Sequence, residues 1–225
     1  MATQRFDELN IIKRRSEPYE QYFGVMALTD KQKRDRIALA LELEDILMIY
    51  FDLFQTTDKI TAKQEFVYML YEKVADGDFF DSEEEQDAYV TRMTDIIAEN
   101  TEKNLAEHPN DVSEYDVEKD ELTPYWVSDD RAMFIAEDEA NTLFNSKEYV
   151  EAKAKGYTHK IWVTYGDDRV RPTHIEVGGA RIPIGSYFDV GKARMLYPKD
   201  VTSEFSTGIA HPEEVISCRC SLTYV

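Results

Sequence analysis

Apolar residues recur at helical spacing through most of the first 155 positions of the chain. In residues 31–56 they fall three or four positions apart, which predicts one long helix with a wide apolar face. A second helix is expected from Thr61, because Gln64 three residues later completes a capping box. A third is expected over residues 83–105, after the capping residue Ser82. The pattern therefore predicts a mostly helical amino-terminal part that follows a polar arm of about 24 residues.

A fourth helix is predicted from about Ser128 to about Lys155, where Gly156 is a favourable carboxyl-terminal cap. The stretch before it, residues 110–124, is acidic and weakly patterned and is interpreted as a linker. We therefore expect two parts, an acidic helical region over residues 1–124 and a second domain over residues 125–225.

The pattern changes to that of strands after Gly156. Residues 157–165 are β-branched and aromatic and alternate with a period of two, which indicates a strand. Residues 175–177 and 181–184 flank a Gly-Gly pair and are interpreted as a hairpin. A last strand is expected over residues 217–224. The predicted class is α+β, a mostly helical part followed by a small domain of one helix and antiparallel strands.

The charge of the chain is strongly negative and unevenly distributed. The net charge is −19. Residues 1–150 carry 36 Asp/Glu and 16 Lys/Arg, a net charge of −20, whereas residues 151–225 are close to neutral. This acidity argues against DNA binding, because it repels a phosphate backbone. It suits a solvated surface or an adaptor for a basic partner. The sequence has no apolar run of about 20 residues and no signal-peptide pattern. We therefore expect that the protein is made in a cytoplasm and is not inserted into a membrane.

The only two cysteines, Cys218 and Cys220, stand one residue apart near the end of the chain. Neither their spacing nor a reducing cytoplasm favours a disulfide between them. On one face of a strand, both sulfurs could bind one zinc ion, with His174 and His211 as nitrogen ligands and Asp168 as an oxygen ligand. The alternative is that they are small buried residues. We favour the alternative slightly, because a C-x-x-C knuckle is missing.

Other side chains near the predicted strands allow a structural or a chemical role. His174 could be a general base oriented by Asp168, but a histidine that holds its turn through hydrogen bonds is the favoured interpretation. Asp168, Arg169 and Arg171 are expected to form an internal ion-pair cluster, since arginine pairs well with carboxylates. Trp162 is expected to pack in the core.

Several segments of the second domain, in this order, resemble one family. They are Arg131 to Glu139, Lys160-Ile161-Trp162, Asp168 to His174, Gly178-Gly179, Phe188, Tyr197-Pro198 and Glu214 to Cys220. Together they resemble the phage Mu F-like head morphogenesis proteins, also called minor head or minor capsid proteins. The resemblance covers about residues 128–225. Ser217 stands where the family commonly has Asn before the first cysteine.

The resemblance implies a structural protein of the virion head, present in few copies. It implies association with the portal or the major capsid protein during procapsid assembly in the host cytoplasm, and a final place in the capsid interior. No phosphate-binding glycine loop and no common hydrolase motif occurs in the sequence, so we expect no enzyme and no required cofactor. The alternative is a zinc-dependent or toxin-like nuclease or hydrolase domain that uses His174 and His211.

Overall fold

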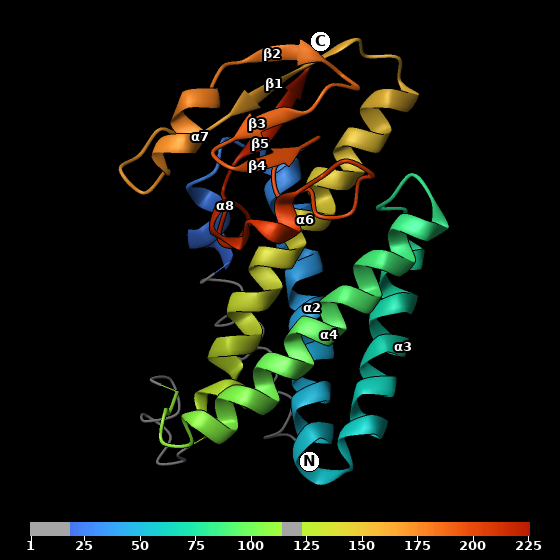
Figure 1. The fold of residues 1–225 in the computed structure, drawn as a ribbon, viewed down its shortest axis with the longest axis vertical. Helices are drawn as coiled ribbons and strands as arrows, with labels where there is room; N and C mark the ends of the chain where they lie inside the picture. The colour runs from blue at the N-terminus through green and yellow to red at the C-terminus, as the bar shows by residue number, and fades with distance from the viewer. Residues whose placement is uncertain (1–18, 114–122) are drawn as a thin grey trace, which may run out of the picture. The chain divides into compact units, whose positions relative to one another are not determined.

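A computed structural model describes residues 19–113 and 123–225 of the chain (Figure 1). Residues 1–18 of the predicted amino-terminal arm and most of the predicted linker lie outside these residues, whereas residues 19–24 of the arm are helical and bury Tyr19 and Phe23. The fold is α+β, as the sequence predicted: long helices are followed by short antiparallel strands. The elements are α2 (Asp30–Thr56), α3 (Lys59–Gly77), α4 (Glu83–Glu107), η1 (Tyr125–Val127), α6 (Asp129–Ala154), β1 (His159–Val163), α7 (Pro172–Val177), β2 (Arg181–Pro183), β3 (Phe188–Val190), β4 (Ala193–Met195), η2 (Gly208–Ala210), α8 (Pro212–Val215) and β5 (Ser221–Tyr224).

The helix ends follow from local side-chain chemistry. The Ser82 side chain accepts a hydrogen bond from the Glu85 amide, so α4 begins where the sequence predicted. Helix α3 begins earlier than expected, because the Asp58 carboxylate accepts the amides of Ile60 and Thr61 and caps the helix. Gly156 has a φ of +79° and follows the end of α6 in the left-handed conformation that glycine allows.

The chain forms two compact units, and the long helices α2 and α6 each contribute to both. Unit 2 comprises residues 42–139, and unit 1 comprises the preceding segment to Leu41 together with Ala140–Val225. Each unit is a set of residues that contact one another in the folded chain, and this does not show that either unit folds by itself. The domain division between residues 124 and 125 therefore stays a prediction.

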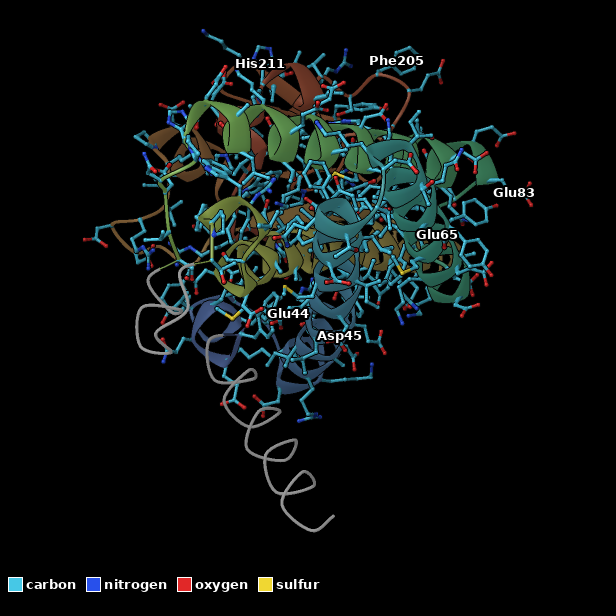
Figure 2. All side chains as sticks on the ribbon, turned by 90° about the horizontal axis from the view of Figure 1, so that it is seen from below. Glu44, Asp45, Glu65, Glu83, Phe205 and His211 are labelled. Atoms are coloured by element: carbon cyan, nitrogen blue, oxygen red, sulfur yellow. The ribbon has the colours of Figure 1, made fainter. Side chains whose placement is uncertain are left out.

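Unit 2 is helical and highly acidic. Its core includes the stacked rings of Tyr50 and Phe66, whose centroids are 4.5 Å apart. Residues 42–139 contain 29 Asp/Glu and seven Lys/Arg, a net charge of −22. Figure 2 shows three of the exposed carboxylates, Asp45, Glu65 and Glu83, on α2, α3 and α4. The negative charge of the whole chain is therefore concentrated in this unit.

Unit 1 contains two small antiparallel sheets, ordered β2-β1-β5 and β3-β4. In the first sheet Trp162 faces Leu222 across β1 and β5. In the second, Phe188 faces Met195. The two sheets share one core with the end of α6, formed by Tyr149, Trp162, Phe188, Val190, Ala193, Met195, Tyr197, Cys218, Cys220 and Leu222.

The predicted hairpin at residues 175–184 is wrong. Residues 172–177 form the helix α7, because Pro172 supplies the fixed φ and missing amide hydrogen that suit a first helical turn. Gly179 then turns the chain with a φ of +79°, and its amide donates to the Trp162 carbonyl (2.8 Å). The strand that follows, β2, pairs with β1 and not with residues 175–177.

Among the described residues, no helix has the length and apolar character needed to cross a membrane.

Candidate metal centre at the carboxyl-terminal cysteines

The two cysteines lie in the short segment that joins α8 to β5. The strand begins at Ser221 and not at residue 217, so both cysteines precede it. Ser217 has a φ of +55°, and the Cys218 amide donates to the Val215 carbonyl (3.1 Å). This tight turn directs the chain from α8 into the core of unit 1, where both cysteine side chains are buried.

The imidazole of His174 lies beside both sulfurs. Its Nδ1 is 3.4 Å from Sγ of Cys220 and 3.5 Å from Sγ of Cys218. The ligand atoms of the three residues all lie within 4.8 Å of one another. His174, Cys218 and Cys220 are only 1–2% exposed. We refer to these three residues as the Cys–His group.

A carboxylate lies on the other side of the same imidazole. Oε2 of Glu214 is 3.2 Å from Nε2 of His174, at an ion-pair distance but without the alignment of a hydrogen bond. The same oxygen accepts a hydrogen bond from the Thr173 hydroxyl (2.8 Å). A methyl group at Gly191 would come within 2.1 Å of the other carboxylate oxygen. Glycine is therefore needed at position 191 for Glu214 to occupy this position.

Two asparagines of α6 hold the backbone of the cysteine segment. Asn141 donates from Nδ2 to the Cys218 carbonyl (2.9 Å), and Asn145 donates to the Cys220 carbonyl (3.2 Å). Arg36 is fully buried, and its Nε donates to the side-chain oxygen of Asn141 (3.1 Å). The Arg36 guanidinium also forms a bidentate pair with Glu148, at 2.8 and 3.1 Å. These bonds fix the positions of both cysteines from the backbone side.

The sequence alone did not predict a role for Arg36, Asn141 or Asn145 in this site. One signal was present: the asparagines are four residues apart, so they share one face of α6. Both asparagines also lie in a stretch of α6, residues 140–146, in which every residue except Phe144 is buried. Amides among such residues indicate buried hydrogen bonding, but the sequence does not show which carbonyls they bind.

The members of the Cys–His group shift one another's pKa values. A hydrogen bond from Cys220, and then the nearby His174, lower the pKa of Cys218 well below its usual value, although burial opposes this. The pKa of Cys220 is raised by the same hydrogen bond and by burial. Burial alone would lower the pKa of His174, but the Cys218 sulfur outweighs it and raises that pKa. The lowered pKa of Cys218 and the raised pKa of His174 both favour opposite charges on these two neighbouring side chains.

The structure does not place His211 or Asp168 in the group. The Nδ1 of His211 lies 3.3 Å from Glu213, and Figure 2 shows this histidine on the outside of its unit. Asp168 is exposed. The ligand set proposed from the sequence is therefore reduced to three residues, and the pairing of His174 with His211 that a nuclease would use is not present.

The ion-pair cluster expected among Asp168, Arg169 and Arg171 involves other residues in the structure. The pair in this turn joins Asp167, and not Asp168, to Arg219 through two hydrogen bonds of 2.8 and 2.9 Å. Arg171 instead donates to the Ile216 carbonyl, and the Arg169 amide donates to the Asp167 side chain (3.2 Å). These bonds tie the turn before α7 to the cysteine segment.

Trp162 lies in the core, as predicted. Its ring is fully buried and meets the His174 ring edge-on, with the centroids 5.7 Å apart. A similar edge-on contact joins it to Phe188 at 5.1 Å. The tryptophan therefore closes the apolar side of the Cys–His group.

Two kinds of chemistry suit this geometry. Thiolate and imidazole donors that converge in a dry site suit a bound metal ion. A thiolate beside a histidine that is itself paired with a carboxylate also has the residue types of a cysteine nucleophile. Because both sulfurs are buried, a substrate has no direct access to them in this conformation. The geometry therefore favours a structural centre over a catalytic one.

A comparison with models of protein families gives a match. A family model described as "Phage Mu protein F like protein" matches residues 96–223, more than half of the chain. Searches of curated proteins and of solved structures found no match. The matched region includes α6, α7, α8 and every member of the Cys–His group.

Proposed function

The chain belongs to the phage Mu protein F like family, and from this we propose that it is a minor head protein that acts in head morphogenesis. The observation that carries the proposal is the family match over residues 96–223. The motifs that resemble minor head proteins, from Arg131 to Cys220, lie inside the matched region. In this proposal the protein is a structural component and not an enzyme.

The proposed place of action is the portal inside the procapsid. Unit 1 would provide a compact folded body, with its most reactive side chains buried in the core. Unit 2 would provide the docking surface, because its net charge of −22 suits a basic surface on the portal or the major capsid protein. The same charge makes DNA an unfavourable partner.

Copurification with the portal protein tests this proposal. The full-length chain is co-expressed with an affinity-tagged portal protein from the same genome, and the complex is isolated and sized at micromolar concentration. The major capsid protein, tagged in the same way, serves as the second bait. Association with the portal at moderate salt that weakens at high salt is the expected result. If the folded chain associates with neither bait, the proposal is wrong.

A matched charge variant separates docking from folding. Replacing Asp45, Glu65 and Glu83, which are exposed, by the neutral amides or by Ser reduces the charge of unit 2 without touching its core. We expect weaker portal binding with only a small loss of melting temperature, because Glu83 lies in the first turn of α4. Unchanged binding would assign docking to another surface and would contradict the proposed role of unit 2.

A further inference from the structure

Three donor atoms converge on one point in the core of unit 1: the two sulfurs of Cys218 and Cys220 and the Nδ1 of His174. We propose that they bind one zinc ion, which joins α7 to the segment that precedes β5. This inference concerns the folded unit itself. It holds or fails independently of the proposed association with the portal.

The distances in the group match those of zinc ligands. With Zn–N of about 2.0–2.1 Å, Zn–S of about 2.3 Å and tetrahedral angles, an imidazole nitrogen and a thiolate sulfur on one ion lie about 3.6 Å apart. The corresponding distances here are 3.4 Å to Cys220 and 3.5 Å to Cys218. Small movements of the side chains therefore suffice to place a zinc ion between the three atoms.

The donor types select zinc among the common divalent ions. Two thiolates and one imidazole are soft or borderline ligands, which suit zinc and disfavour magnesium and calcium. The chain supplies three donors, and a tetrahedral ion takes a fourth, for which a water molecule is the simplest source. Three protein ligands and a water are the pattern of catalytic zinc sites. Because the sulfurs are only 1–2% exposed, we assign this centre a structural role.

The residues around the three donors are those that a zinc site requires. A histidine ligand usually presents its second nitrogen to a carboxylate or a carbonyl, which fixes the orientation of the ring. Nε2 of His174 faces Glu214 in this way (3.2 Å), and Thr173 holds that carboxylate. On the other side, Asn141 and Asn145 hold the cysteine carbonyls. Both sides of the group are therefore pre-oriented.

Zinc would also stabilise a long loop. His174 and Cys218 are 44 positions apart, and an ion bound by both restricts the unfolded chain much as a cross-link does. Helix α7, which carries His174, has only six residues, and α8, which directly precedes the cysteine segment, has only four. Such short helices are not stable alone, so a shared ion would contribute strongly to this part of the fold.

Metal analysis of the full-length protein tests the proposal. The protein is produced in zinc-supplemented medium, purified without chelators and analysed by mass spectrometry of the elements. We expect about one zinc per chain. The variants Cys218→Ser, Cys220→Ser and His174→Ala should each lose most of it, whereas His211→Ala, which changes a histidine outside the group, should retain it. A wild-type protein without zinc, or zinc that survives all three ligand changes, would overturn the proposal.

A second measurement uses only the wild-type protein, so it tests the proposal even if the variants do not fold. Wild-type protein is stripped of metal with a chelator and then titrated with Co²⁺. Sulfur-to-cobalt charge-transfer absorption together with tetrahedral d–d bands is the expected result. Zinc should displace the cobalt and restore the melting temperature that stripping lowered. A stripped protein that melts like the untreated protein and gives no sulfur-to-cobalt band would also overturn the proposal.

Discussion

The carboxylate of Glu214 and the imidazole of His174 lie 3.2 Å apart, on the side of the ring that faces away from the two cysteines. This pairing gives each ring nitrogen a separate neighbour: Nε2 faces the carboxylate and Nδ1 faces the sulfurs. It depends on a glycine in another element, because any side chain at Gly191 would collide with Glu214. The β3–β4 turn is therefore part of the Cys–His group's support.

Replacing Gly191 by Ala should destabilise the protein strongly. The φ of +59° at this position disfavours any Cβ atom, at a cost of about 1–2 kcal/mol. The added methyl would also displace the Glu214 carboxylate, for a total loss of about 3 kcal/mol in the free energy of unfolding. Urea titration followed by circular dichroism measures this loss.

Gly179→Ala is the matched control for this change. Gly179 also has a positive φ, +79°, but nothing lies within 4 Å of an added Cβ. It should therefore lose only the backbone cost of about 1–2 kcal/mol. Equal losses in the two variants would show that crowding against Glu214 has no effect.

Replacing Asn141 by Ala should cost about 2–3 kcal/mol in the free energy of unfolding. The change leaves both the Cys218 carbonyl and the Arg36 Nε without the amide that now pairs with them. Asn104→Ala is the control, because the Asn104 amide bonds only its own helix at an exposed position. That variant should stay within about 0.5 kcal/mol of the wild type. An equally small loss at Asn141 would contradict the proposed support of the cysteine backbone.

Replacing Ser217 by Asn should stabilise the protein by about 0.5 kcal/mol, because asparagine tolerates the left-handed conformation better than other residues with a side chain. Ser217 has a φ of +55° directly before Cys218. Ser217→Val should have the opposite effect, because a β-branched residue is strained at this φ. The melting temperatures of the three proteins, measured by thermal unfolding, give their order of stability. An order other than Asn, Ser, Val would show that backbone conformation does not limit this turn.

Replacing Lys160 by Met should change how stability depends on pH. Burial lowers the pKa of Lys160 to about 7, whereas an unfolded lysine has a pKa of about 10.4. Between these values the unfolded chain binds more protons at this site than the folded chain, so the contribution of Lys160 to stability rises with pH. We therefore compare the free energy of unfolding of the wild type with that of Lys160→Met. The difference, wild type minus variant, should increase from pH 7 to pH 9.5, by up to about 1.4 kcal/mol per pH unit.

Urea titrations of both proteins over this range measure that difference. The hydrogen bond from Lys160 to the Leu196 carbonyl (2.6 Å) is stronger when the side chain is protonated, so it acts through the pKa in the folded protein and does not reverse the trend. A difference that stays constant with pH would show that Lys160 remains protonated in the folded protein.

The long helices could be predicted from the sequence because their apolar period is repeated over many turns. Ser82 and Gly156 marked helix ends for local reasons, and both were correctly assigned. Helix α7 was missed because it has only six residues, too few to show a period. Its β-branched Ile175 and Val177 before two glycines were also typical of a hairpin. The decisive signal was Pro172 at its first position.

The Cys–His group was only partly predictable. The C-x-C spacing indicated that the two sulfurs act together, but the sequence offered two histidines and an aspartate as partners. Only the tertiary fold brings His174 to Cys218 across 44 positions and leaves His211 beside Glu213. Sequence spacing carries no such information when the partners come from separate elements.

The central claim is that this chain is a minor component of a phage head. Quantitative mass spectrometry of particles produced from the genome that encodes it tests this most directly. Purified procapsids and DNA-filled heads are compared with the lysate, and the copy number of the chain is referred to those of the portal and the major capsid protein. We predict that the chain is enriched in the particles at a copy number near that of the portal and far below that of the major capsid protein. A chain abundant in the lysate and absent from both kinds of particle would contradict the account.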